Sequence, residues 1–449
     1  MMNKIFLSLI VVVLFATGCQ KKSDYLLNKT PDERLSEALQ QYQDVLTGAP
    51  YGWKVLVYPQ GLVSAYGVTS VFSYYMKFKD SNFVTMYSDF DTVTAVIPKT
   101  SAYRLKALQR PSIEFDSYGY IHLPCDPDPV ISKSPVASEG GGYGWGSDFD
   151  FSFADNVSPG QLGDTIHLMG NFNHSPAIMV RATQAEQTAY NNQGLKNAMI
   201  FNKILNYYKQ INFGGNSFEV TPGSGPRDVY FKWLDDAGNL QSSASVSYSY
   251  TLDGIYFSSP VSAKSQTIKS IDNIVFDPAS SVASVKVNGT PGTLQGVIAS
   301  LRTDSAAPAR WYATTATNFN ACWRSSTAFH VNGADDGLGI AKAVPNFYQY
   351  WYWYHAISTT IDFFGPMIIS AGALTNAPYY SRVKAGPAFA NGKAVFTLNA
   401  NTGTHPAAVA STTSLFYNAA GWYFVQVDNV TYDMVLASDA KSWIRWTHN

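Results

Sequence analysis

Two aspartates are the residues whose type and spacing first suggest chemistry. Asp148 and Asp150 stand two positions apart in the stretch GWGSDFDFSF. On a β-strand they would share one face, where two carboxylates could act as an acid–base pair or bind calcium. A half-buried strand with its aromatic side chains inside has the same alternation. Because this second interpretation explains every residue without a ligand, we predict a turn entering a strand, with Phe149 and Phe151 buried and both aspartates on the opposite face.

A second stretch with chemical potential is the aromatic run NFYQYWYWYHAIS, residues 346–358. On a strand the tyrosines would line one face and the tryptophans the other. Aromatic surfaces with a polar rim bind sugar rings and peptide side chains. The alternatives are a central strand packed on both faces or part of a buried helix. We predict that part of the run faces a cleft and contacts an oligomeric ligand. The candidate residues are Tyr350, Trp351, Tyr352, Trp353 and, from the glycine-rich stretch, Trp145.

Familiar catalytic and metal-binding motifs do not occur in the sequence. The seven histidines are scattered, and neither HExxH nor CxxC is present, so we expect no zinc site. The absence of GxSxG argues against an α/β-hydrolase serine. Asp335 and Asp336 in NGADDGLG lack the spacing of an EF-hand, and a polar turn is the favoured interpretation. We expect no cofactor, no metal and no catalytic residue. A hydrolase using Asp148 and Asp150 remains the alternative.

The first residues indicate export. Lys4 precedes the apolar run IFLSLIVVVLFATG, which is too short for a confident membrane span and is followed by Cys19. The residues ATGC resemble a bacterial lipobox. We predict a signal peptide over residues 1–18, lipidation of Cys19 and a polar tether over 19–29. The protein would then be anchored by lipid to the outer membrane, on either its periplasmic or its cell-surface side.

Composition restricts the kinds of partner. The formal net charge is −1, only 14% of the 449 residues are charged, and no basic run occurs. A nucleic-acid partner is therefore not expected. Beyond Cys19 only Cys125 and Cys322 remain, and the sequence leaves open whether they pair.

The elements that position these residues are mostly strands. A capping box at Thr30–Glu33 begins an amphipathic helix that stops at Gly48 and Pro50. Hairpins are predicted over 74–88, 112–123, 228–240 and 246–258. A second capping box, at Thr183–Glu186, precedes a helical stripe that reaches Tyr208.

We predict a mainly β (α+β) fold of antiparallel, meander- or sandwich-like sheets with a few helices. The length of the chain suggests more than one domain. The predicted divisions are an N-terminal helix and β domain over 30–182, a helical connection over 183–215 and a C-terminal β-rich domain over 216–449.

The chain resembles the DUF4302 family of Bacteroidetes lipoproteins, whose function is not established. The resemblance rests on the lipobox, on ERLSEALQQYQDVLTGAPYGWKVLVYP, on YYMKFKDSNFVTMYS, on SAYRLKALQRPSIEFDSYGYIHL and on the strand of type D-[FY]-[ED]-F at 148–151. It covers about residues 19–210. Members resemble accessory lipoproteins of SusC/SusD-type importers. The resemblance therefore implies capture or handling of an oligomeric nutrient, a peptide or a glycan, and our leading hypothesis is a non-catalytic binding protein. A ligand-free partner of the importer is a further alternative.

Overall fold

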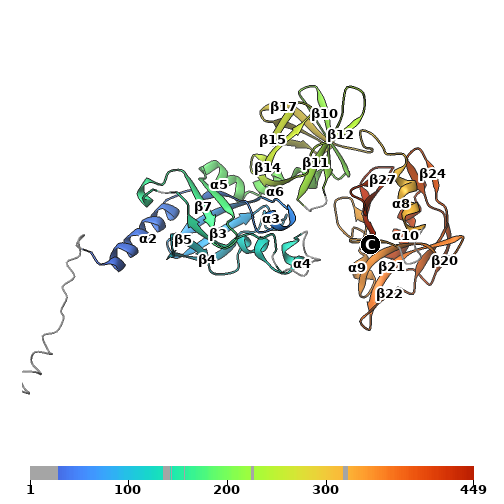
Figure 1. Ribbon diagram of the computed structural model, residues 1–449, viewed down its shortest axis with the longest axis horizontal. Helices are drawn as coiled ribbons and strands as arrows, with labels where there is room; N and C mark the ends of the chain where they lie inside the picture. The colour runs from blue at the N-terminus through green and yellow to red at the C-terminus, as the bar shows by residue number, and fades with distance from the viewer. Residues whose placement is uncertain are drawn as a thin grey trace, which may run out of the picture.

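Three antiparallel sheets follow one another along the chain (Figure 1). The computed structural model describes residues 29–134, 142, 144–155, 157–223, 227–316 and 322–448. The predicted signal peptide and Cys19 lie outside these residues. The sheets are a closed eight-stranded barrel, a nine-stranded sheet and a twelve-stranded sheet, and a few helices accompany them. The predicted mainly β fold is therefore confirmed.

The first helix, α2 (Pro31–Thr47), begins where the sequence predicts. The Thr30 side chain accepts the Glu33 N–H at 3.1 Å, and the Glu33 carboxylate accepts the Thr30 N–H at 2.7 Å. Each bond satisfies a donor that the helix start would otherwise leave unpaired. The buried face of α2 meets the barrel, where the Trp53 indole N–H donates to the Leu46 carbonyl at 2.9 Å.

The barrel closes because its first strand pairs with both the second and the last. Its strands are β1 (Trp53–Val57), β2 (Phe72–Lys79), β3 (Phe83–Ser88), β4 (Lys99–Ala107), β5 (Pro111–Phe115), β6 (Asp150–Phe153), β7 (Thr165–Gly170) and β8 (Pro176–Arg181). Short helical turns lie between them: α3 (Val63–Tyr66), η1 (Tyr120–Cys125), α4 (Pro129–Ser132) and η3 (Pro159–Gln161).

The hairpin predicted over 74–88 is confirmed, since β2 and β3 pair around Asn82. The hairpin predicted over 112–123 is wrong. β5 pairs with β4 and β6, and the residues after Phe115 form η1 instead. Tyr120 and Ile121 are adjacent and both buried, which a strand with one solvent face does not allow.

The predicted second helix is interrupted. Helices α5 (Gln184–Asn191), α6 (Gly194–Ala198) and α7 (Ile200–Lys203) replace one continuous helix, and β9 begins at Tyr208. The chain turns at Gln193, whose backbone is left-handed with φ of 62°. The stripe beyond Ile204 does not remain helical, because residues 208–213 pair with two strands of the second sheet.

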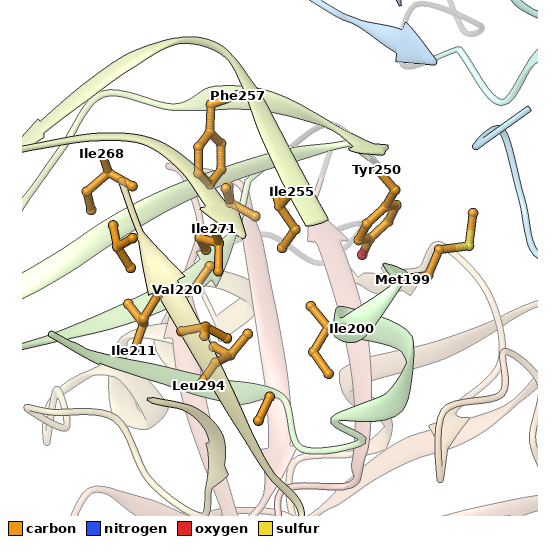
Figure 2. Packing of buried hydrophobic residues seen from close by; sticks show 14 of the residues in the cluster. Met199, Ile200, Ile211, Val220, Tyr250, Ile255, Phe257, Ile268, Ile271 and Leu294 are labelled. Atoms are coloured by element: carbon orange, nitrogen blue, oxygen red, sulfur yellow. The ribbon is translucent and has the colours of Figure 1, made fainter. Parts of the chain in front are cut away.

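The second sheet curls back on itself, since β10 pairs with both β9 and β11. Figure 2 shows its core, which contains Ile211, Phe257 and Leu294 from the strands together with Ile200 from α7. Its strands are β9 (Tyr208–Phe213), β10 (Asn216–Pro222), β11 (Asp228–Leu234), β12 (Leu240–Ser242), β13 (Val246–Thr251), β14 (Gly254–Ala263), β15 (Gln266–Asp277), β16 (Val282–Val287) and β17 (Thr290–Val297). The hairpins predicted over 228–240 and 246–258 are confirmed by the pairs β11–β12 and β13–β14.

The third sheet curves around helices α8 (Ala307–Ala316) and α10 (Ala407–Phe416) (Figure 1). Trp311 of α8 and Phe416 of α10 are fully buried with Trp323 and Trp446 of the sheet. Its strands are β18 (Trp323–Ser325), β19 (His330–Val331), β20 (Phe347–Ser358), β21 (Ile361–Ser370), β22 (Ala373–Asn376), β23 (Tyr380–Lys384), β24 (Ala388–Ala390), β25 (Lys393–Val395), β26 (Leu398–Thr402), β27 (Trp422–Gln426), β28 (Thr431–Leu436) and β29 (Ser442–His448), and the short helix α9 (Ile340–Ala343) precedes β20.

The three sheets can be placed along the predicted domain divisions. The barrel ends at Arg181, next to the expected bound at residue 182. The segment 183–215 contains α5, α6, α7 and β9. The segment 216–449 contains the rest of the second sheet and all of the third. The domain bounds themselves stay a prediction.

Candidate functional site

Asp148 and Asp150 do not share a face of a strand. Asp148 precedes β6, is 3% exposed, and accepts the backbone N–H groups of Phe172 (2.9 Å), Asn173 (2.8 Å) and Ser175 (3.1 Å). Phe149 is 41% exposed. The prediction was therefore wrong for Asp148, which is buried, and for Phe149, which is exposed, because the strand begins only at Asp150. The carboxylate of Asp148 instead holds the loop between β7 and β8 in place by hydrogen bonds.

Asp150 has the environment of an ordinary strand residue. It is partly exposed and accepts the Asn171 amide at 2.7 Å. Burial raises its pKa, and the hydrogen bond from Asn171 opposes this effect. Phe151, the next residue, is 1% exposed and packs in the barrel core as predicted.

Trp145 is also part of the barrel core. It is 2% exposed, its indole N–H donates to the Ser132 carbonyl at 2.8 Å, and its ring meets Phe72 edge-on at 5.5 Å. Its remaining surface contributes to the wall of a cavity of about 620 Å³ that is also lined by Asp89 and Arg227. The indole therefore offers little surface to a ligand in this structure.

The aromatic run forms strand β20, and its faces alternate as predicted from Tyr350 to Trp353. The prediction was wrong at the start of the strand, where an irregularity before Gln349 leaves Tyr348 52% exposed and Phe347 packed against the core. Tyr350 and Tyr352 point into the core and are 1% and 0% exposed. The Tyr352 hydroxyl donates to the buried Asp362 carboxylate at 2.6 Å, and burial followed by the charge of Asp362 holds the pKa of Tyr352 well above its usual range. Asp362 also accepts the hydroxyl of Tyr312 at 3.0 Å. Tyr350 and Tyr352 are thus structural in this arrangement and present no surface to a ligand.

Trp351 and Trp353 lie on the other face of β20 and are partly exposed. Their ring centroids are 5.9 Å apart, at an angle of 72°. The guanidinium group of Arg324, on the neighbouring strand β18, lies 5.0 Å from the centre of the Trp351 ring. A cation in this position is attracted by the face of the indole.

The next strands extend this surface. On β21, Gly365 stands opposite Trp351, and Phe363 stands opposite Trp353. A side chain at Gly365 would come within 2.6 Å of Tyr380 and 2.9 Å of Phe363, whose rings are 5.0 Å apart. The absent side chain therefore leaves space for both rings. We call Trp351, Trp353, Phe363 and Tyr380, with the flanking Arg324, the aromatic face; Phe363 is buried within it and the others are partly exposed.

A cavity of about 490 Å³ opens at the end of β20. Its lining includes Tyr312, Tyr354, His355 and Lys384. Tyr354 stacks on His355 at 3.6 Å and meets Tyr312 edge-on at 5.2 Å. Tyr354 is the part of the aromatic run that borders a cavity, whereas Trp351 and Trp353 lie on an open face.

Sequence reasoning located the two tryptophans but missed their neighbours. Arg324, Phe363, Gly365 and Tyr380 come from three other strands, and only the pairing of β18, β20, β21 and β23 brings them together. A weak signal exists in FFGP, residues 363–366, where a glycine interrupts a strand rich in apolar residues.

The remaining candidates have structural roles. Asp336 accepts the N–H groups of Ile340 (2.7 Å) and Ala341 (2.9 Å) at the start of α9, within a turn. Cys125 and Cys322 are free thiols. Within the described residues, no group of three or more His, Cys, Asp or Glu side chains is placed to hold a metal ion. No helix among those residues is long and apolar enough to cross a membrane.

The fold defines a protein of three successive antiparallel sheets, with an aromatic face on the third. The chain belongs to the family described as "Domain of unknown function (DUF4302)", whose model matches residues 23–274, more than half of the sequence. The barrel and most of the second sheet lie in this match, and the aromatic face lies outside it.

Other comparisons add no functional information. No curated protein matches the chain. A DNA polymerase sliding clamp from Pseudomonas aeruginosa with ligand is 8% identical and aligns over 92% of this chain and 97% of its own, with a TM-score of 0.15. The DNA polymerase III subunit beta from Pseudomonas aeruginosa is 8% identical, aligns over 93% and 98%, and has the same TM-score. At this score the likeness supports no argument about fold or function.

Proposed function

We propose that this protein is a lipid-anchored, non-catalytic accessory protein of the outer membrane that binds an oligomeric nutrient, a peptide or a glycan. It would work beside a SusC/SusD-type importer, as the resemblance to Bacteroidetes lipoproteins implies. The lipobox ending at Cys19 supports the anchor. A chain held there would present its three sheets beyond a short polar tether.

The observation that carries the proposal is the exposure of Trp351 and Trp353 together on one face of the third sheet. Tyr350 and Tyr352 point to the opposite face of the strand and are buried in the core. The two indoles are partly exposed on the other face of the strand, and accessible aromatic groups of this kind are common at binding sites. The aromatic face therefore suits repeated apolar contacts with sugar rings or peptide side chains.

The test compares retention of the protein in gels that contain soluble polysaccharides or peptide mixtures. We expect the Trp351→Ala/Trp353→Ala double variant to lose the retention of the wild type, because the variant removes both exposed rings. The loss corresponds to about 1–3 kcal/mol of binding energy, the usual range for hydrophobic anchors at an interface. Unchanged thermal unfolding of the variant would show that the loss is not one of folding.

Phe172→Ala is the matched control, because Phe172 is an 83% exposed aromatic residue on the barrel, far along the chain from the aromatic face. Its retention should equal that of the wild type. Retention of the double tryptophan variant at wild-type level would contradict the proposal. Absence of retention for the wild type across all probes would favour a ligand-free importer partner.

A further inference from the structure

We propose that the aromatic face binds acidic oligosaccharides, whose sugar rings contact the indoles while their carboxylates pair with arginine. This inference rests on the proposed function and specifies its ligand. Two arginines provide the charge. Arg324 flanks Trp351 on β18, and Arg382 on β23 stands opposite Phe363, which itself stands opposite Trp353. The two guanidinium groups thus lie on either side of the tryptophan pair.

Within the part of the chain that the structure describes, neither arginine forms an ion pair. The ion pairs found among the described residues involve other cations, such as Arg227 with Asp89 and Arg445 with Asp433. The Nε atoms of Arg324 and Arg382 are both buried and without a hydrogen-bond partner. An arginine held partly buried beside aromatic rings, with no carboxylate of its own, favours an anion from outside.

The surrounding chain is almost without negative charge. Between Asp336 and Asp428 the sequence contains one carboxylate, Asp362, against the cations Lys342, Arg382, Lys384 and Lys393. Asp362 is 0% exposed and accepts hydrogen bonds in the core, so it contributes no carboxylate to the outer surface. Lys384 follows Arg382 on the same strand and lines the cavity next to Tyr354. This distribution is complementary to a polyanion and repels a polycation.

The position of the face favours a glycan over a peptide. Strand β20 is paired on both sides, with β18 and β21, and β21 is paired further with β23. At Trp351 and Tyr352, β20 is thus paired on both sides and has no free edge to which a peptide strand could add. What remains accessible is side-chain surface, namely indole rings bordered by guanidinium groups. Sugar rings contact such surfaces, and carboxylates match the guanidinium geometry.

The experiment measures retention in gels containing polygalacturonate, alginate or hyaluronan, each beside its methyl-esterified form, in which the rings are kept and the charge is removed. We expect the protein to bind at least one of the acid forms. Esterification of the glycan, Arg324→Gln or Arg382→Gln should each weaken this binding roughly tenfold or more, because each removes a charge-assisted contact. Higher salt should weaken binding further. Arg110→Gln, at an exposed arginine on the barrel, should bind as the wild type does.

The outcomes separate the two proposals. Binding of the esters or of neutral glycans that requires Trp351 and Trp353, with no effect of either arginine substitution, overturns the acidic ligand and leaves the proposed function in place. Retention by poly-glutamate in preference to every glycan would assign a peptide and also overturn this inference. If the Trp351→Ala/Trp353→Ala variant still bound both the acidic and the neutral glycans, the aromatic face would be rejected as the binding site. Unchanged thermal unfolding of Arg324→Gln and Arg382→Gln is required for each comparison.

Discussion

At the scale of the residue, Asp148 shows how one carboxylate can resemble a catalytic group while holding a loop. It accepts three backbone N–H groups from residues 172–175. The backbone of Gly170 passes so close that a side chain there would collide with the Asp148 carboxyl group. The carboxylate is thus used for hydrogen bonding within the protein, and with 3% of its surface exposed it offers little to a substrate.

Replacing Asp148 by Ala should destabilise the protein strongly. The substitution removes the acceptor of three loop N–H groups, one buried and two partly buried, at a cost of about 1–3 kcal/mol for each buried group that finds no other partner. We expect a total loss of about 3 kcal/mol or more, measured as a shift of the urea unfolding midpoint followed by tryptophan fluorescence.

Asp150→Ala is the matched control, because that side chain is partly exposed and its hydrogen bond to Asn171 is accessible to solvent. Its effect should stay below about 1 kcal/mol. Equal effects of the two substitutions would contradict the role assigned to Asp148. If Asp150→Ala abolished a hydrolytic activity without changing stability, the carboxylate hydrolase would replace the binding protein.

At the scale of the element, β21 depends on a glycine. Gly365 is buried between β20 and β23, and its lack of a side chain allows the rings of Phe363 and Tyr380 to meet. Gly365→Ala places a methyl group within 2.6 Å of Tyr380, so one ring or strand must move. We expect a loss of about 1–3 kcal/mol in stability, as for other overpacked sites, together with weaker ligand binding.

The comparison variant is Gly160→Ala, in the short helical turn η3, where no atom lies within 4 Å of an added methyl group. It should leave both thermal unfolding and binding unchanged. If Gly365→Ala unfolds and binds as Gly160→Ala does, the close packing of the aromatic face is not needed for its function.

At the scale of the whole molecule, buried carboxylates link the sheets. Asp89 of the barrel, 2% exposed, pairs with Arg227 of the second sheet and also accepts Ser249 and the Tyr250 N–H, both at 2.9 Å. A second buried carboxylate, Asp433, pairs with Arg445 within the third sheet and accepts at 2.7 Å the hydroxyl of Tyr207, the residue before β9 of the second sheet. Each carboxylate therefore accepts hydrogen bonds from residues far away in the sequence.

Asp89→Ala should therefore weaken the junction between the barrel and the second sheet. The substitution leaves the Arg227 guanidinium buried without its partner, which costs about 3–5 kcal/mol. We expect a lower melting temperature and faster proteolysis between the two sheets. The double variant Asp89→Ala/Arg227→Met should recover part of the loss, because it removes the unpaired charge.

The surface pair Asp304–Arg310 is the control, since both side chains are about half exposed. Asp304→Ala should change stability by less than about 1 kcal/mol. A similar small effect of Asp89→Ala would show that the buried pair does not hold the barrel to the second sheet.

The sequence by itself determined those features of the fold that depend only on residues close together in the chain. The capping box at Thr30–Glu33, the hairpin β2–β3 and the alternation of tyrosine and tryptophan along β20 are all local, because helix caps, tight turns and strand pleats are set within a few residues. The family membership also follows from sequence.

Only the tertiary structure decided those features that depend on contacts between segments distant in the chain. It decided that residues 208–213 are a strand, that the tyrosines of β20 and not its tryptophans face the core, and that Asp148 is buried. It also gathered Arg324, Gly365 and Arg382 around Trp351 and Trp353. The physical reason is that strand pairing and burial are settled by contacts between segments far apart in sequence, where the pattern within each segment fits either face equally well.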